Sequence, residues 1–325
     1  MRSLTAYLGG SRLLQGGMFP GGRSETDARS PAVKATAQWG LGDAAMRFNA
    51  EIVDKHSLDD FKRVINMLTD LAKGCILHIC PDKLNFILLG SPESGGASLW
   101  CELPQENFFS TFQMQGISAE YNEIYLQVQL ENITRVVNTP HSTETLRIKF
   151  INKYSGILKF CIKQLPESNR SRTMTYYFPI VVIPTNFWNE LQEPIVPDLD
   201  VSIYLPVLKT LKNFVEKMKH INNHIVIEAN QNGELNLKIQ NELVSVTTYF
   251  PDLGSPPLAL ENASQDRHLE EMAEMHINIY QLLHFLGGVQ DNPTKAIFNM
   301  VRNRISYFEF LYEIFSVKYF IPALH

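Results

Sequence analysis

The sequence predicts an α+β protein in which two similar units follow one another along the chain. An amphipathic, lysine-bearing helix pattern begins at Ser57 and again at Pro206, and a strand pattern follows each start after 18 residues, at Cys75 and at His224. A second, shorter helix pattern starts 74 residues after the first in one unit and 73 residues after it in the other. Repetition at a distance of 149 residues indicates a tandem duplication. Such a duplication favours a ring or arc, with helices on one surface and sheets on the other, over an enzyme with one cleft.

The first helix of unit one has clear start and face signals. Ser57 suits an N-cap, acidic residues follow in the expected first turn, and Gly74 suits the C-terminal stop. The predicted buried stripe comprises Phe61, Val64, Leu68 and Leu71, and the predicted opposite face comprises Lys62, Asn66, Thr69 and Lys73.

The rest of unit one alternates between strand patterns and turns. A short helical turn is expected at 106–112 and a helix at 131–138, which Pro140 would stop. Strands are expected at 48–54, 75–80, 84–89, 98–103, 123–130, 145–151, 157–165 and 173–183.

A proline-rich and acidic stretch separates the two units. Residues 184–200 contain three prolines and four acids, which predicts a semi-extended linker rather than a regular element. The predicted domains are therefore 46–183 and 201–325, with 184–200 between them.

Unit two repeats the pattern of unit one. Pro206 suits the first position of a helix, and Asn232-Gly233 is a type I′ hairpin signal. Residues 251–268 are expected to form a mobile loop and 280–286 a helix. Strands are expected at 201–205, 224–229, 235–239, 244–250, 274–279, 296–301, 305–310 and 315–321. The predicted buried stripe of the first helix is Leu208, Leu211, Val215 and Met218, opposite Lys209, Lys212, Glu216 and Lys219.

The first 45 residues have a different composition. They contain eight glycines and no sustained period, so they are expected to be disordered. Arg2 and Arg12, with no acid before Glu25, are typical of a mitochondrial transit peptide. The favoured alternative is an upstream extension without a structural role, with Met46 as the natural initiator.

Composition excludes several classes of protein. With 325 residues the chain is long enough for two domains, and its net charge of −5 argues against a molecule that is basic throughout and binds nucleic acid with its whole surface. No run of 18 apolar residues occurs, so no membrane span is expected. The four cysteines match no zinc template and are interpreted as buried free thiols. They are Cys75, Cys80, Cys101 and Cys161.

The sequence contains no motif of a known catalytic site. Phosphate-binding loops, dinucleotide fingerprints, zinc-protease motifs and nucleophile elbows are absent, so neither an enzyme nor a cofactor is predicted. His220 and His224 are four residues apart but straddle a helix end, which favours surface histidines over a metal site. The sharper signal is the recurrence of lysines on equivalent helices. Those lysines are either an ordinary solvated face or a surface that contacts DNA.

Several long stretches carry a family resemblance. The chain resembles sliding clamps of the PCNA superfamily, and more narrowly the Hus-one subunit of the nine-one-one checkpoint clamp. The resemblance covers residues 46–325 and leaves out residues 1–45. The stretches that carry it are MRFNAEIVD at Met46, CELPQENFFSTFQMQGIS at Cys101, QEPIVPDLDVSIYLPVLKTLK at Gln192, HIVIEANQNGELNLKI at His224, DLGSPPLA at Asp252, NPTKA at Asn292 and SVKYFIPAL at Ser316.

The resemblance implies the DNA-clamp fold and a noncatalytic function. The chain would be one of three different subunits of a ring of six domains, with helices lining the hole and antiparallel sheets outside. An ATP-dependent clamp loader would place the ring around double-stranded DNA at damage sites, without sequence specificity, in the nucleus after a cytoplasmic stage. There it would support checkpoint signalling and tether repair enzymes. The alternative within the same fold is a homotrimeric replication clamp. The expected DNA-facing residues are Lys62, Lys73, Arg135, Lys209, Lys212 and Lys219.

The resemblance also implies that subunits pair through sheet edges. The expected edges are 173–183 and 243–249, and the linker would border a groove that binds client proteins. Phe187 and Trp188 are either elements of that groove or, as favoured, anchors that hold the linker to its own domain. The expected interface residues are Tyr177, Ile180, Val182, Val244, Val246 and Thr248.

Overall fold

The computed structural model describes residues 46–90, 96–139, 143–153, 155–164, 172–196, 198–257, 270–289 and 291–324. The predicted disorder of residues 1–45, and most of the predicted loop at 251–268, lie outside these ranges.

The first half of the described chain contains ten strands and three α-helices. The linker, predicted to lack regular structure, begins with a 3₁₀ helix. In chain order the elements are β1 (Arg47–Ile52), α2 (Lys55–Leu71), β2 (Gly74–Ile79), β3 (Lys83–Leu89), β4 (Ser98–Pro104), α3 (Gln105–Phe108), β5 (Thr111–Gln115), β6 (Ile124–Gln129), α4 (Leu130–Val137), β7 (Thr143–Lys153), β8 (Ser155–Gln164), β9 (Arg172–Pro179), β10 (Val181–Val182) and the 3₁₀ helix η2 (Thr185–Leu191).

The second half repeats most of this order. Its elements are β11 (Val201–Tyr204), α5 (Leu208–Met218), β12 (His224–Ala229), β13 (Leu235–Gln240), β14 (Ser245–Phe250), β15 (Ala273–Asn278), α7 (Ile279–Gly288), β16 (Lys295–Val301), β17 (Ile305–Leu311) and β18 (Ser316–Pro322).

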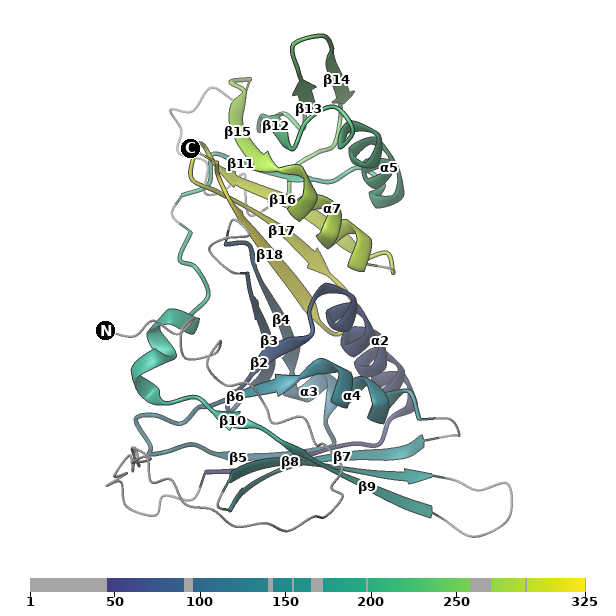
Figure 1. Ribbon diagram of the computed structural model, residues 1–325, viewed down its shortest axis with the longest axis vertical. Helices are drawn as coiled ribbons and strands as arrows, with labels where there is room; N and C mark the ends of the chain where they lie inside the picture. Colours follow the sequence, from purple (N-terminus) through teal and green to yellow (C-terminus); the bar gives the residue numbers. More distant parts are fainter. Residues whose placement is uncertain are drawn as a thin grey trace, which may run out of the picture. The chain divides into compact units, whose positions relative to one another are not determined.

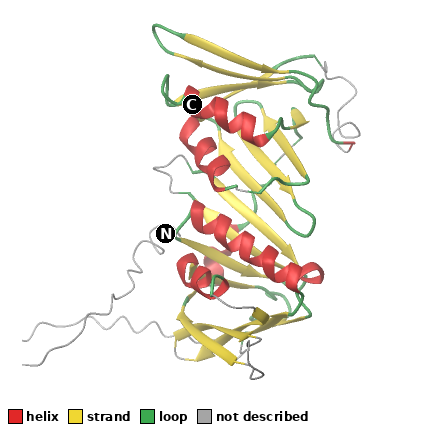
Figure 2. Ribbon diagram, turned by 90° about the vertical axis from the view of Figure 1, so that its right-hand side faces the viewer, coloured by secondary structure: helices red, strands yellow, loops and turns green. Residues whose placement is uncertain are grey.

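The strands form three antiparallel sheets, and the middle sheet is shared by both halves. A five-stranded sheet has the order β5-β1-β7-β8-β9, and a four-stranded sheet has the order β14-β13-β12-β15. The nine-stranded sheet between them runs β10-β6-β2-β3-β4-β18-β17-β16-β11. Helices α5, α7, α2 and α4 follow one another on the same side of this sheet (Figures 1 and 2).

Sheet order confirms that the two halves are built alike. The first half contributes β6-β2-β3-β4 to the shared sheet, and the second half forms β15-β12-β13-β14 in the same order. The same relation holds between β1-β7-β8-β9 and β11-β16-β17-β18. By this correspondence β4 is the counterpart of β14, and β18 is the counterpart of β9. The two halves are joined where β4 pairs with β18, from Ser98 opposite Phe320 to Glu102 opposite Ser316.

Helix boundaries differ from the prediction because the caps lie elsewhere. Asp54 caps α2 by accepting a hydrogen bond from the backbone N–H of Ser57 at 2.8 Å, so Ser57 lies inside the helix. The helix ends at Leu71, and Gly74 begins β2 instead of acting as a C-terminal stop. Helix α5 begins at Leu208, two residues after Pro206.

The predicted opposite face of α2 is only partly exposed. The Thr69 hydroxyl lies 2.7 Å from the Thr134 hydroxyl of α4. Asn66 Oδ1 accepts a hydrogen bond from Asn138 Nδ2 at 2.9 Å. These contacts form a polar seam between α2 and α4, while Lys62 and Lys73 remain exposed.

One predicted strand and one predicted turn were wrong in detail. The run 173–183 is two strands in two sheets: β9 pairs with β8, and β10 pairs with β6. Ile180, between them, is buried, and its side chain packs beside Gly156. In the β12–β13 turn, Gly233 has a φ of 88° but Asn232 does not have positive φ, so the turn is not type I′.

The core lies between the helices and the sheets (Figure 2). In the second half, the Phe285 ring of α7 stacks on Tyr319 with centroids 4.3 Å apart and lies 4.9 Å from Phe310. Phe310 is fully buried on β17, next to the strand that joins the halves.

The Phe310→Ala variant is expected to lose about 3–5 kcal/mol of unfolding free energy, because its ring fills the core beneath α7. The three tryptophans, Trp39, Trp100 and Trp188, all precede residue 201. Because the halves share one sheet, tryptophan fluorescence and far-UV circular dichroism should report the same lowered urea midpoint. The control is Phe214→Ala, a matched change at a ring 36% exposed, which should lose less than half as much. A circular dichroism midpoint that falls while the fluorescence midpoint stays constant would show that the halves unfold independently.

Candidate functional site

The predicted DNA-facing cations lie on or beside the helices, and four of the six are exposed. Lys62 is on α2, Lys73 lies between α2 and β2, Arg135 is on α4 and Lys209 is on α5. The Arg135 guanidinium lies 3.9 Å from Glu131, one turn earlier, so part of its charge is balanced locally. Their orientation toward DNA remains a prediction.

The other two cations converge at the junction of α5 and α7. Lys212 and Lys219 are half-buried and line a shallow hollow together with Tyr280 and His284 of α7. His220, at the end of α5, is exposed, as predicted for a surface histidine, and it lines this hollow with Lys212 and Lys219.

Both predicted pairing segments contain an edge strand. β9 is the last strand of the five-stranded sheet, and β14 is the last strand of the four-stranded sheet. Exposed apolar side chains gather at these edges: Tyr177 is 58% exposed, Leu243 is 91% exposed and Tyr249 is 69% exposed. A free strand edge with exposed apolar side chains can pair with another chain.

The predicted interface residues do not all lie at these edges. Tyr177 and Val244 are exposed, and Val246 and Thr248 are half-buried on β14. Ile180 is part of the chain's own core, and Val182 pairs with β6 inside the subunit, which argues against both as edge contacts. Leu243 and Tyr249 are more exposed than the residues chosen on the same segment.

The linker is held down by aromatic anchors. Phe187 and Trp188 are both buried in η2, and the Trp188 Nε1–H donates to the Ile183 carbonyl at 3.0 Å. The Trp188 ring also lies 4.8 Å from the ring of Tyr125 on β6. These contacts favour the anchoring interpretation over direct contact with a client.

Beyond the anchors, the linker borders a groove over the nine-stranded sheet. The groove has a volume of about 340 Å³ and is lined by the linker, the β2–β3 turn and the edges of β4 and β18. Lys318 of β18 pairs with Glu193 of the linker at 2.8 Å, and Lys83 pairs with Glu102 of β4 at 2.7 Å. The groove therefore has ion pairs at its rim.

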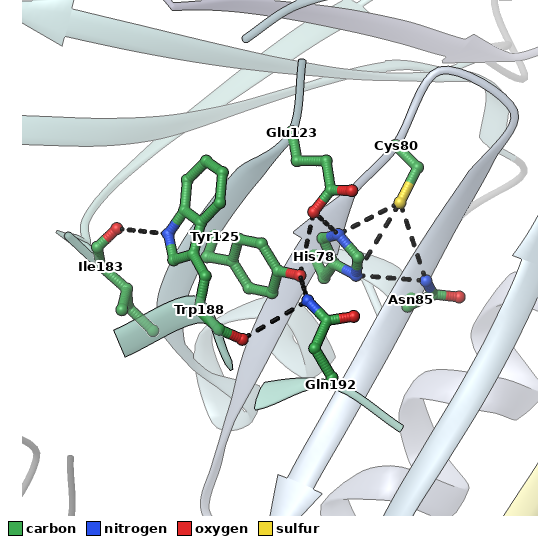
Figure 3. Close-up of polar contacts among 8 residues, drawn as sticks. All are labelled: His78, Cys80, Asn85, Glu123, Tyr125, Ile183, Trp188 and Gln192. Atoms are coloured by element: carbon green, nitrogen blue, oxygen red, sulfur yellow. Dashed lines mark hydrogen bonds and ion pairs between the residues drawn. The ribbon is translucent and has the colours of Figure 1, made fainter. Parts of the chain in front are cut away.

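A partly buried polar network lies at the inner wall of the groove (Figure 3). His78 and Tyr125 are buried, Glu123 is half-buried and Gln192 is exposed. Glu123 accepts a hydrogen bond from the Tyr125 hydroxyl and lies 3.0 Å from His78 Nε2. Gln192 of the linker donates to the Tyr125 hydroxyl at 3.0 Å. Burial, offset in part by Glu123, lowers the pKa of His78. Burial, reinforced by nearby acids, raises the pKa of the Cys80 thiol to about 12.

The sequence did not predict this network. Its four cysteines were predicted to be buried free thiols; all four are free, and Cys75, Cys80 and Cys101 are buried, but Cys161 is only half-buried. The signal for a cluster was weak in the sequence, because Glu123 is 43 residues beyond Cys80. Among the described residues, no helix is long and apolar enough to span a membrane.

Comparison with known proteins identifies the family. The family model of the Hus1-like protein matches residues 46–325. Checkpoint protein HUS1 of Homo sapiens is 56% identical over 279 residues, which is 86% of this chain and 100% of that protein. The checkpoint protein hus1 homolog of Dictyostelium discoideum is 30% identical, over 86% of this chain and 99% of that protein. The chain therefore belongs to the Hus1-like protein family.

Solved structures identify the fold. PCNA from Thermococcus kodakaraensis matches 85% of this chain and 99% of its own, with a TM-score of 0.59 and 16% identity. PCNA from Entamoeba histolytica matches 86% of this chain and 99% of its own, with a TM-score of 0.61 and 13% identity. The predicted DNA-clamp fold is confirmed.

The Glu309→Gln variant should be more stable than the natural protein at neutral pH. Glu309 lies opposite Lys318 across the β17–β18 pair, and burial raises its pKa above the usual value. Since the unfolded chain loses this proton at a lower pH than the folded chain, Glu309 opposes folding increasingly as pH rises. The urea midpoint of Glu309→Gln should exceed that of the natural protein at pH 7.5, and the difference should shrink at pH 4.

The control for this prediction is Glu242→Gln, the same change at an exposed loop position. Its urea midpoint should stay close to that of the natural protein at both pH values. An equal gain for Glu309→Gln at both pH values would indicate a packing effect instead of proton linkage.

Proposed function

We propose that this Hus1-like protein is a noncatalytic subunit of a heterotrimeric sliding clamp that encircles DNA and acts in the DNA-damage checkpoint. The single observation that supports assembly into a clamp is that the two free edge strands correspond to the two strands that pair inside the chain, β4 and β18. The counterparts of β18 and β4, namely β9 and β14, are unpaired at opposite ends of the described sheets. The checkpoint role is supported by the names of the human and Dictyostelium relatives.

The free edges explain how a ring could close. If β14 of one subunit pairs with the β9 equivalent of the next, the contact between subunits repeats the contact inside each subunit. Such a head-to-tail contact closes into a ring when its rotation divides the circle evenly. With two domains per subunit, three subunits would supply six similar domains and continuous sheets on the outside.

The cations fit a molecule that is held on DNA by its shape. A closed ring needs only weak, nonspecific contacts with phosphates, because topology prevents its escape. Lys62, Lys73, Arg135, Lys209, Lys212 and Lys219 are the proposed contacts. The net charge of −5 leaves the rest of the surface acidic, which limits wider adhesion to DNA.

Partners and location follow from this proposal. Two different clamp subunits would cover β9 and β14, and an ATP-dependent loader would open the ring around double-stranded DNA. The linker groove would receive checkpoint and repair proteins. The assembled ring would work in the nucleus, with unassembled subunits in the cytoplasm. A homotrimeric replication clamp is the less favoured alternative, because the relatives above are named as checkpoint proteins.

Co-expression with two candidate clamp subunits should give a one-to-one-to-one complex. Size-exclusion chromatography with light scattering measures this stoichiometry directly. The Tyr249→Glu variant places a charge on the β14 edge and should weaken one subunit contact at least tenfold, while Tyr280→Glu, on α7, should assemble normally. A stable trimer of this chain alone would contradict the heterotrimer and favour the replication clamp.

Charge reversal on α5 should weaken binding of the assembled complex to linear duplex DNA. The triple variant Lys209→Glu, Lys212→Glu and Lys219→Glu removes three cations, so affinity should fall roughly tenfold or more at low salt and depend less steeply on salt. Fluorescence anisotropy across a salt series measures both quantities.

The matched control for this prediction reverses three lysines on β7 and β8, namely Lys149, Lys159 and Lys163. This variant carries the same net charge as the α5 variant. An equal loss of affinity in both variants would mean that net charge, and not the helix surface, determines DNA binding.

A further inference from the structure

We propose that His78, Cys80 and Glu123 form a binding site for a divalent cation, with Zn²⁺ as the best-fitting ion. The site lies in the inner wall of the linker groove and would leave one coordination position open to that groove. This inference is independent of the clamp function, because it rests only on side chains of this chain.

Three ligand atoms of different chemistry converge at one point. His78 Nε2 lies 3.1 Å from Cys80 Sγ and 3.0 Å from Glu123 Oε2, and all three ligand atoms lie within 4.8 Å of one another. Zinc bonds of about 2.0–2.3 Å in a tetrahedron place neighbouring ligands roughly 3.3–3.6 Å apart. His78 Nε2 would therefore need to move only a few tenths of an ångström away from Cys80 Sγ and from Glu123 Oε2. The Cys80 Sγ and Glu123 Oε2 atoms, which lie within 4.8 Å of each other, would reach the same spacing by rotation of their side chains.

Adjacent strands hold these ligands in place. His78 is on β2, and Cys80, two residues later, follows the end of that strand and lies on the same face. Ile79 pairs with Ile124 of the antiparallel strand β6, so the next residue, Cys80, lies opposite Glu123. Because the backbone positions are set by the sheet, the site would need little ordering on binding.

Neighbouring groups can orient the ligands. Asn85 Nδ2 lies 3.3 Å from His78 Nδ1, and the Tyr125 ring stacks on the His78 ring with centroids 3.9 Å apart. With a metal on Nε2, Nδ1 would carry the proton, and a half-turn of the Asn85 amide would present its oxygen as the acceptor. Partners of this kind are typical behind histidines that bind metals.

The charge around the site favours a cation. Four carboxylates and only two ammonium groups line the groove. The main cost is the Cys80 proton, because burial keeps this thiol protonated. Binding would form a sulfur–metal bond, break the S–H bond and release the proton to solvent through the groove. An imidazole, thiolate and carboxylate set suits zinc better than magnesium or calcium, which prefer oxygen ligands.

Cobalt(II) tests the site, because a thiolate bound to it gives a near-ultraviolet charge-transfer band. The full chain, freed of metal with a chelator, should bind one Co²⁺ with this band, and Zn²⁺ should abolish it. Cys80→Ser should lose the band. Glu123→Gln should weaken Co²⁺ binding at least tenfold, because loss of a residue that only hydrogen-bonds to a metal ligand already weakens binding roughly 10–100-fold.

The matched control is Cys161→Ser, which removes the half-buried thiol of β8 and should retain the band. Circular dichroism would verify that each variant is folded. Absence of a band in the folded natural protein, an unchanged band in Cys80→Ser, or loss of the band in Cys161→Ser would each overturn the proposal. None of these outcomes bears on assembly with other subunits, so the clamp proposal would be judged separately.

Discussion

The pairing of β4 with β18 is the contact on which the rest of the structure depends. It uses one edge from each repeated half and joins two sets of four similar strands, which together with β10 form a single sheet of nine strands. The halves correspond strand by strand, so each of these two strands has a counterpart in the other half. These counterparts, β9 for β18 and β14 for β4, remain as free edges. The helices follow from this arrangement, since each half packs its pair on the same side of the shared sheet (Figure 2). The fold, the proposed assembly and the proposed DNA surface therefore all depend on this one strand pair inside the chain.

The linker is attached to the rest of the chain by different kinds of contact along its length. Its first part is fixed by Phe187 and Trp188, whose burial and hydrogen bond to Ile183 hold η2 against the first half. Its second part, at Gln192 and Glu193, is attached by polar groups, through Gln192 to Tyr125 and Glu193 to Lys318. Its end is attached to the second half at Asp200, which accepts a hydrogen bond from the Arg302 backbone N–H at 2.8 Å. Exposed ion pairs contribute little stability, so this second part can be displaced at lower cost than the first. The groove that we assign to clients lies beside this second part.

Much of the fold could be predicted from periodicity, and the errors have identifiable causes. The stripe Phe61, Val64 and Leu68 predicted the buried face of α2, and spacing between repeats predicted the duplication. Periodicity could not show that 173–183 changes sheets near Ile180, since β10 has only two residues and no period of its own. Cap identity also depended on three-dimensional detail, because Asp54 and Ser57 are both good caps. The cluster of His78, Cys80 and Glu123 depends on which strands are neighbours, which no local pattern contains. The proposed DNA-facing residues were chosen because lysines recur on equivalent helices, and four of the six are exposed while Lys212 and Lys219 are half-buried.

The two free edges affect how much of this protein a cell can produce without harm. A newly made copy without partners displays Tyr177 on one edge and Leu243 and Tyr249 on the other, each on a ready template for strand addition. Copies in excess of their partners would therefore polymerise or be recognised as misfolded. The longer a copy stays unassembled, the more often this would happen. In the proposed heterotrimer, production of the three different chains would have to stay in balance, and the scarcest chain would limit the amount of the complex. Overproduction of this chain alone would burden protein quality control instead of raising checkpoint capacity.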